Sequence, residues 1–161
     1  GLQNTTSFES IRVTSSSFMK GAVERMAKGD IDQAFAENTL KELELYEKYY
    51  KEYLKEIPND YHANVNLVYL YYLKTFLGKN SIQEARVLID SSYKLSPGNI
   101  LTYQMDALLY LYEGKISEAE RVIKEAIALL PEIKTSYEIL AHIENQKKTF
   151  PEISFLPLEG L

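Results

Sequence analysis

The chain has 161 residues, of which 45% are hydrophobic and 25% charged, and its net charge is −5. This length suits one domain with a substantial core, and the acidic balance argues against a nucleic-acid partner. The absence of cysteine excludes disulfides and thiolate catalysis. The longest apolar run, residues 65–73, is too short to cross a bilayer, so no direct membrane insertion of this segment is expected. The chain begins with glycine, which suggests a soluble segment excised from a larger protein, cytoplasmic or exported.

The first segment, residues 1–14, is rich in serine and threonine and has no hydrophobic period, so a flexible arm is expected there. Residues 15–60 are expected to form a first helical hairpin with an unusually long second helix. Residues 31–57 contain neither glycine nor proline and carry a stripe of leucine and tyrosine at helical spacing. A helix of about 27 residues would be roughly 40 Å long. Its extra turns would pack on the arm or on a second chain.

A second hairpin is expected over residues 61–99 and a third over residues 100–133. The third hairpin has the clearest signals. Gly114 is the residue type that ends helices in the left-handed conformation, and Pro131 cannot continue the second helix. Residues 134–148 then predict one more helix with a polar face, typical of a capping helix at the end of a stack.

Small and apolar residues recur at an interval of 34 residues, which aligns Ala119 with Ala85 and Pro131 with Pro97. The pattern of an aromatic, a small residue, a second aromatic, glycine, two spaced alanines and a closing proline resembles the tetratricopeptide repeat family. The resemblance implies an all-α fold, a right-handed α-α superhelix of about three hairpins plus the capping helix, since one hairpin cannot bury both its faces. The positions that carry it are Tyr103, Ala107, Tyr110, Gly114, Ala119, Ala126 and Pro131.

Asp106 departs from this pattern, because the family usually has leucine at that place. Two interpretations are open. The helix is rotated slightly so that Met105 packs in its stead, or Asp106 is a functional carboxylate that lines the concave surface.

Arrangements of residues suited to catalysis are absent from the sequence. It has no glycine-rich phosphate loop, no HExxH motif and no cluster with metal-ligand spacing. We therefore expect a protein that is not an enzyme and uses no metal or cofactor. Of the two histidines, His62 and His142, the second lies one turn after Glu138, and we expect these two to pair at the surface.

The resemblance also places the first helix of each hairpin on a concave groove, where such proteins usually bind extended peptides. The residues extrapolated to this groove are aromatic and apolar rather than basic. We therefore predict a non-catalytic scaffold that binds an apolar peptide or helix of a protein partner. The predicted partner-binding residues are Tyr69, Tyr72, Leu101, Gln104, Leu108, Leu111, Tyr112 and His142.

Two partners from the chain itself are also candidates. Residues 149–161 contain two prolines and five large apolar residues before Glu159, which is too apolar for a free tail. This apolar tail is a candidate occupant of the groove of the same or a neighbouring chain. A homodimer built through residues 31–57 is the other candidate. A further alternative is that the aromatic residues only pack between helices and that the groove binds no ligand.

An alternative function follows from a second resemblance. The long helix and the 39-residue spacing from Pro58 to Pro97 are similar to the repeat regions attached to bacterial membrane glycan polymerases and ligases of the O-antigen type. That resemblance implies an accessory extramembrane region of a larger enzyme whose chemistry lies elsewhere.

Overall fold

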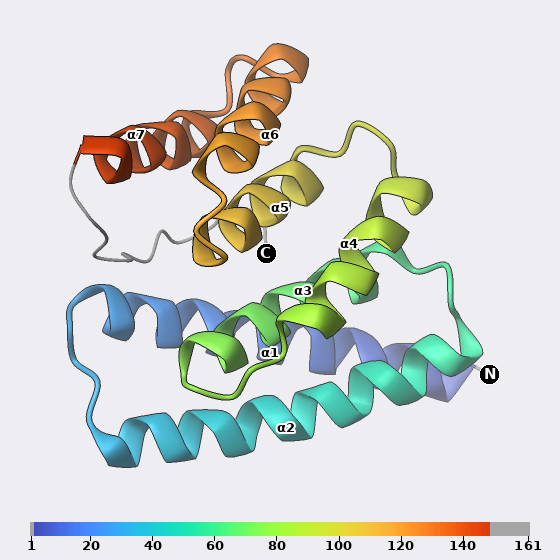
Figure 1. Ribbon diagram of the computed structural model, residues 1–161. Helices are drawn as coiled ribbons and strands as arrows, with labels where there is room; N and C mark the ends of the chain where they lie inside the picture. The colour runs from blue at the N-terminus through green and yellow to red at the C-terminus, as the bar shows by residue number, and fades with distance from the viewer. Residues whose placement is uncertain (1, 149–161) are drawn as a thin grey trace.

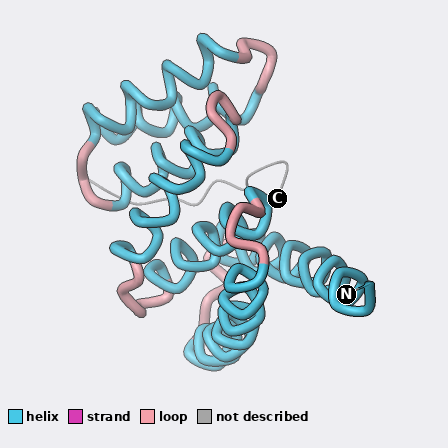
Figure 2. Tube along the Cα trace, turned by 90° about the vertical axis from the view of Figure 1, so that its right-hand side faces the viewer, coloured by secondary structure: helices cyan, strands magenta, loops and turns pink. Residues whose placement is uncertain are grey.

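The computed structural model of the chain describes the backbone of residues 2–148 and the side chains of residues 8–148. Within these residues every regular element is an α-helix, and short loops join the helices (Figures 1 and 2). The expected all-α fold class is therefore confirmed. The seven helices are α1 (Leu2–Ala27), α2 (Gln33–Glu56), α3 (Tyr61–Phe76), α4 (Ile82–Leu95), α5 (Ile100–Tyr112), α6 (Ile116–Leu129) and α7 (Lys134–Lys148).

Local signals set several of the helix ends. The side chain of Asp60 accepts a hydrogen bond from the backbone N–H of Ala63 at 2.9 Å, so it caps the otherwise unsatisfied first turn of α3. Asp32 caps α2 in the same way, through the N–H of Phe35 at 2.7 Å. At the end of α5, Gly114 has a φ of +73°, the left-handed conformation that lets the chain turn into α6.

Small side chains lie at the seams where helices approach one another. Ala85, Ala119 and Ala126 are fully buried, as the 34-residue spacing requires. Met105 is also fully buried. It therefore packs in the core in place of the leucine that the family pattern has at position 106. Because a buried alanine leaves no room for a larger side chain, these positions determine how closely the hairpins pack.

The helices form two layers. The first helices α1, α3, α5 and α7 each contact the next first helix, while α2, α4 and α6 each pack between two successive first helices. Figure 1 shows the hairpins following one another from α1 and α2 at the bottom to α6 and α7 at the top. The right-handed superhelix stays a prediction. Among the described side chains, successive first helices are joined by hydrogen bonds: Ser16 Oγ to Asn66 Oδ1 at 3.2 Å, the Tyr61 and Thr102 hydroxyls at 2.9 Å, and Gln104 Nε2 to Ser136 Oγ at 3.1 Å.

The start of the chain differs from the expected flexible arm over residues 1–14. The helix α1 begins at Leu2, well before the start expected at Ser15. Its first half packs on the second half of α2: the ring of Phe8 stacks on Tyr53 at 3.3 Å between centroids and meets the edge of Tyr50 at 5.7 Å. The long helix expected over residues 31–57 is present as α2. Its extra turns pack on α1. Of the two expected possibilities, the N-terminal arm and a second chain, the structure shows the first.

The apolar tail, residues 149–161, lies outside the described residues. Among residues 2–148, no helix has both the length and the apolar character needed to span a membrane.

Candidate functional site

The candidate site is the side of α3, α5 and α7 that points away from α2, α4 and α6. We call it the inner face and define it by Tyr69, Tyr72 and Phe76 on α3 and by Leu101, Leu108, Leu111 and Tyr112 on α5. Helical periodicity places these residues opposite the side chains that contact the second helices. On α5, for example, Asp106 faces α4, while Leu108 and Tyr112 lie on the other side of the helix.

Aromatic rings form a continuous row across this face. Tyr69 stacks on Tyr72 with 6.2 Å between ring centroids, and Tyr72 meets Phe76 at the same separation. The row then crosses to the next hairpin, because Phe76 lies 6.1 Å from Tyr112. Aromatic pairs at these separations attract one another beyond their apolar burial. The predicted residues Tyr69, Tyr72 and Tyr112 therefore belong to one cluster of rings, which Phe76 completes, and Phe76 and Tyr112 are its half-buried members.

Phe76 was missed by the sequence reasoning. Its spacing could have found it, since it lies one helical turn after Tyr72 and so shares a face with it. The second hairpin departs from the 34-residue interval, with 39 residues from Pro58 to Pro97, so the repeat alignment did not assign Phe76 to this face.

A hollow of about 260 Å³ lies at the opposite end of the inner face, where α3 and α5 begin. It contains two predicted residues, Leu101 and Gln104. The amide nitrogen of Gln104 already donates to Ser136 of α7, so this group holds two helices together and is not offered to a partner. The hollow is lined by Tyr61, His62, Asn99, Ile100, Leu101, Gln104 and Ile133.

Burial divides the predicted residues into two groups. Tyr72 and Leu108 are only 3% and 1% exposed, and Tyr69, Gln104 and Leu111 are buried as well. Leu101, Tyr112 and His142 are half-buried. A charge introduced at Leu108 would destabilise the fold, so Tyr112 is the better position for testing binding. Burial also raises the pKa values of the Tyr69 and Tyr72 hydroxyls above the ordinary value for tyrosine, so both hydroxyls are neutral at physiological pH.

The pairing of Glu138 with His142 expected from the sequence is wrong. Glu138 forms an ion pair with Lys134 at 3.2 Å. His142 lies next to Gln146, with 3.2 Å between their side-chain nitrogens. Burial lowers the pKa of His142, so its imidazole is uncharged at physiological pH.

Asp106 is not a groove carboxylate. It accepts a hydrogen bond from the Tyr93 hydroxyl at 2.8 Å and forms an ion pair with Arg86, and both partners lie on α4. Arg86 also donates to Glu113 and lies over the ring of Tyr110, 3.9 Å from its centroid. Because burial disfavours the charged form, the pKa of Asp106 is raised despite these partners. This network joins the second hairpin to the third.

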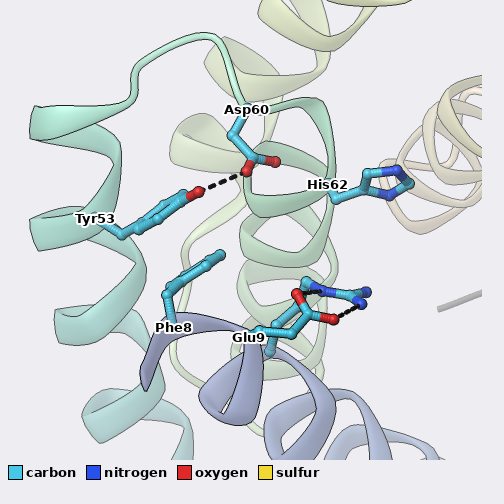
Figure 3. Close-up of a pocket in the computed structure, with 6 residues that line it drawn as sticks. Phe8, Glu9, Tyr53, Asp60 and His62 are labelled. Atoms are coloured by element: carbon cyan, nitrogen blue, oxygen red, sulfur yellow. Dashed lines mark hydrogen bonds and ion pairs between the residues drawn. The ribbon is translucent and has the colours of Figure 1, made fainter. Parts of the chain in front are cut away.

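A polar pocket of about 460 Å³ lies where α1, α2 and α3 meet (Figure 3). Tyr53 donates to Asp60 at 2.8 Å, and burial together with this carboxylate raises the pKa of Tyr53 to about 12. Arg12 donates to Glu9 at 3.0 Å. Four of the six residues that line the pocket thus form two pairs, and we interpret the pocket as a junction between helices. The lining residues are Phe8, Glu9, Arg12, Tyr53, Asp60 and His62.

An apolar hollow of about 390 Å³ lies on the other layer, between α2, α3 and α4. Val87 at its edge is 70% exposed. We call it the outer hollow, and it is the main competitor to the inner face as a binding surface. Apolar residues Leu54, Leu67, Tyr71, Val87 and Leu88 line it together with Lys51, Lys55 and Glu84.

Within the described part of the chain, no three His, Asp or Glu side chains come together as metal ligands would. No model of a known protein family matches the sequence, and the curated proteins compared with it include no match.

Proposed function

We propose that the protein is a non-catalytic interaction scaffold of the tetratricopeptide type and that its inner face binds an apolar segment of a protein partner. The observation that carries the proposal is the aromatic row that joins Tyr72 and Phe76 of α3 to Tyr112 of α5. Rings from two hairpins make a surface that neither hairpin has alone. The 34-residue spacing supports the same conclusion.

The physical basis of binding is a rigid apolar surface. The first helices are held to one another by hydrogen bonds such as Tyr61–Thr102 and Gln104–Ser136, so little order has to be gained when a partner binds. Aromatic side chains bury a large area at a low cost in side-chain entropy, and tyrosine hydroxyls can hydrogen-bond the backbone of an extended segment.

The chemistry of the partner follows from the charges. The residues that define the inner face are aromatic or aliphatic, and none of them is Asp, Glu, Lys, Arg or His. A charged segment would lose its hydration there without gaining an opposite charge. We therefore expect a peptide with two or more large apolar side chains and few charges.

The test uses short random peptides displayed on phage, selected against the full chain and then synthesised with a fluorescent label. Their affinities are measured by fluorescence anisotropy. Tyr112→Ala should weaken binding about 30-fold, since truncating an aromatic anchor costs about 2 kcal/mol. The matched control is Tyr49→Ala, because Tyr49 is a 40% exposed tyrosine on α2.

The control chain should bind as the unmodified chain does. Selection of no peptide, or equal weakening by both substitutions, would contradict the proposal. Selection of acidic or basic peptides in place of apolar ones would contradict the expected partner chemistry.

A further inference from the structure

The inner face has an apolar segment of the same chain within reach. The helix α7 ends at Lys148, and residues 149–161 follow it with the sequence TFPEISFLPLEGL. We propose that residues 150–158 of this tail occupy the inner face of their own chain and compete there with the partner. This inference concerns regulation of the proposed binding site and rests on the proposed function.

The direction of the helices brings the start of the tail to the aromatic end of this face. The helices α3 and α5 are parallel, because Tyr61 bonds Thr102 at their starts and Phe76 contacts Tyr112 at their ends. Lys147 of α7 forms an ion pair with Glu120 in the second turn of α6. The helix α6 begins directly after the turn that follows α5, so the start of α6 lies beside the end of α5. Because the end of α7 contacts the start of α6, α7 ends on the same side of the molecule as α5 and α3.

The length of the tail is sufficient. Packed helices lie about 8–10 Å apart, so the path from α7 across α5 to α3 is roughly 16–20 Å. Seven extended residues, 149–155, span about 23 Å. Phe155 and Leu156 can therefore reach Tyr72 and Phe76 without any change in the helices.

The chemistry of the two surfaces agrees. The apolar residues of the tail are Phe150, Ile153, Phe155, Leu156 and Leu158, and Glu152 is its only charged side chain before Glu159. Two prolines disfavour a helix and favour an extended conformation. An extended apolar segment is the type of ligand that the proposed function requires.

The burial of the inner face is consistent with an occupant. Among the described helices, α3 contacts the flanking first helices α1 and α5 and the second helices α2 and α4 behind it. Tyr69 and Tyr72 on this helix nevertheless keep only 1% and 3% of their whole surface exposed. The apolar tail would supply the cover on the remaining side of α3.

A tryptophan reporter tests the placement, because the chain contains no tryptophan. In the full chain carrying Phe155→Trp, the indole emission should be blue-shifted and shielded from acrylamide. Adding Tyr112→Ala should shift the emission to longer wavelength and increase quenching. The matched control is Leu161→Trp, near the end of the chain, which should emit as an indole in water. Identical emission from both reporters would overturn the inference.

Light scattering identifies which copy holds the tail. A monomer whose Phe155→Trp emission does not change on dilution supports occupation by its own tail. A dimer whose dissociation exposes the indole would overturn it in favour of exchange between chains.

Competition is tested with the selected labelled peptides. The full chain with Phe155→Ser and Leu156→Ser should bind them about tenfold more tightly than the unmodified chain, since a tethered competitor acts at an effective concentration near millimolar. Leu161→Ser should leave the affinity unchanged. Peptide binding with an exposed indole would refute this inference and leave the proposed function standing. A buried indole without peptide binding to any variant would refute the proposed function and leave the tail as a fixed part of the fold.

Discussion

The Tyr93 hydroxyl donates a hydrogen bond to Asp106 Oδ2 at 2.8 Å, and this contact joins the second helix of one hairpin to the first helix of the next. The same carboxylate forms an ion pair with Arg86, which lies two helical turns before Tyr93 on the same face of α4. A charged residue thus stands at a seam where the repeat pattern has an apolar one. The seam is held by polar contacts as well as by packing.

Asp106→Ala should destabilise the fold, because it removes the acceptor of the Tyr93 hydroxyl and one of the carboxylates that pair with the largely buried Arg86. We expect a loss of about 1–3 kcal/mol in the free energy of unfolding. The control is Asp90→Ala, the same substitution at an exposed position on α4. Urea unfolding followed by far-UV circular dichroism measures both. Equal effects would show that the network contributes no stability.

Phe8→Ala tests the helical start of the chain. Phe8 is buried against Tyr50 and Tyr53, so truncation should cost roughly 3 kcal/mol. Val13→Ala, on the same helix at a position that is 53% exposed, should change stability by less than about 0.5 kcal/mol. If Phe8→Ala were as mild as Val13→Ala, residues 2–14 would be the loose arm that their composition predicts.

Two glycines should respond to alanine in opposite directions. Gly114 has a φ of +73°, so Gly114→Ala should cost about 1 kcal/mol. Gly21 lies inside α1, and a Cβ built on it has no neighbour within 4 Å. Gly21→Ala should therefore stabilise the protein by about 0.5–1 kcal/mol. Shifts of the same sign in thermal unfolding would contradict the assignment of these two backbone positions.

Acid should weaken the attachment of α7 to α6. Hydrogen bonds from Lys124 and Lys147 lower the pKa of Glu120 from 4.5 to about 2. A carboxylate with a lowered native pKa stabilises the fold fully above its unfolded value and loses that contribution as the pH falls from about 4.5 toward 2. The difference in unfolding free energy between the unmodified chain and Glu120→Gln should therefore shrink across this range. Glu125→Gln, which removes a pair within α6 alone, should show a smaller difference at neutral pH. A difference for Glu120→Gln that does not vary with pH would contradict the assignment.

The parts of the fold that the sequence predicted have local signals. Gly114 and the closing prolines separate helices, and the alanine spacing marks seams such as the buried Ala85 and Ala119. These signals are residue types at fixed positions or at a fixed interval along the chain, so periodicity finds them.

The parts that were missed depend on contacts between distant residues. Phe8 stacks on Tyr53 although 45 residues separate them, and packing of this kind makes the start of α1 helical despite the composition of residues 2–14. Gln104 was expected to face a partner, but its side-chain amide donates a hydrogen bond to Ser136, 32 residues away. Spacing within one helix could not reveal either contact.

Intermolecular nuclear Overhauser effects between an isotope-labelled full chain and a selected unlabelled peptide test the central claim most directly. The proposed binding surface predicts contacts from the apolar side chains of the peptide to the rings of Tyr72, Phe76 and Tyr112. Contacts to Leu54, Val87 and Leu88 of the outer hollow, with none to the three rings, would contradict it.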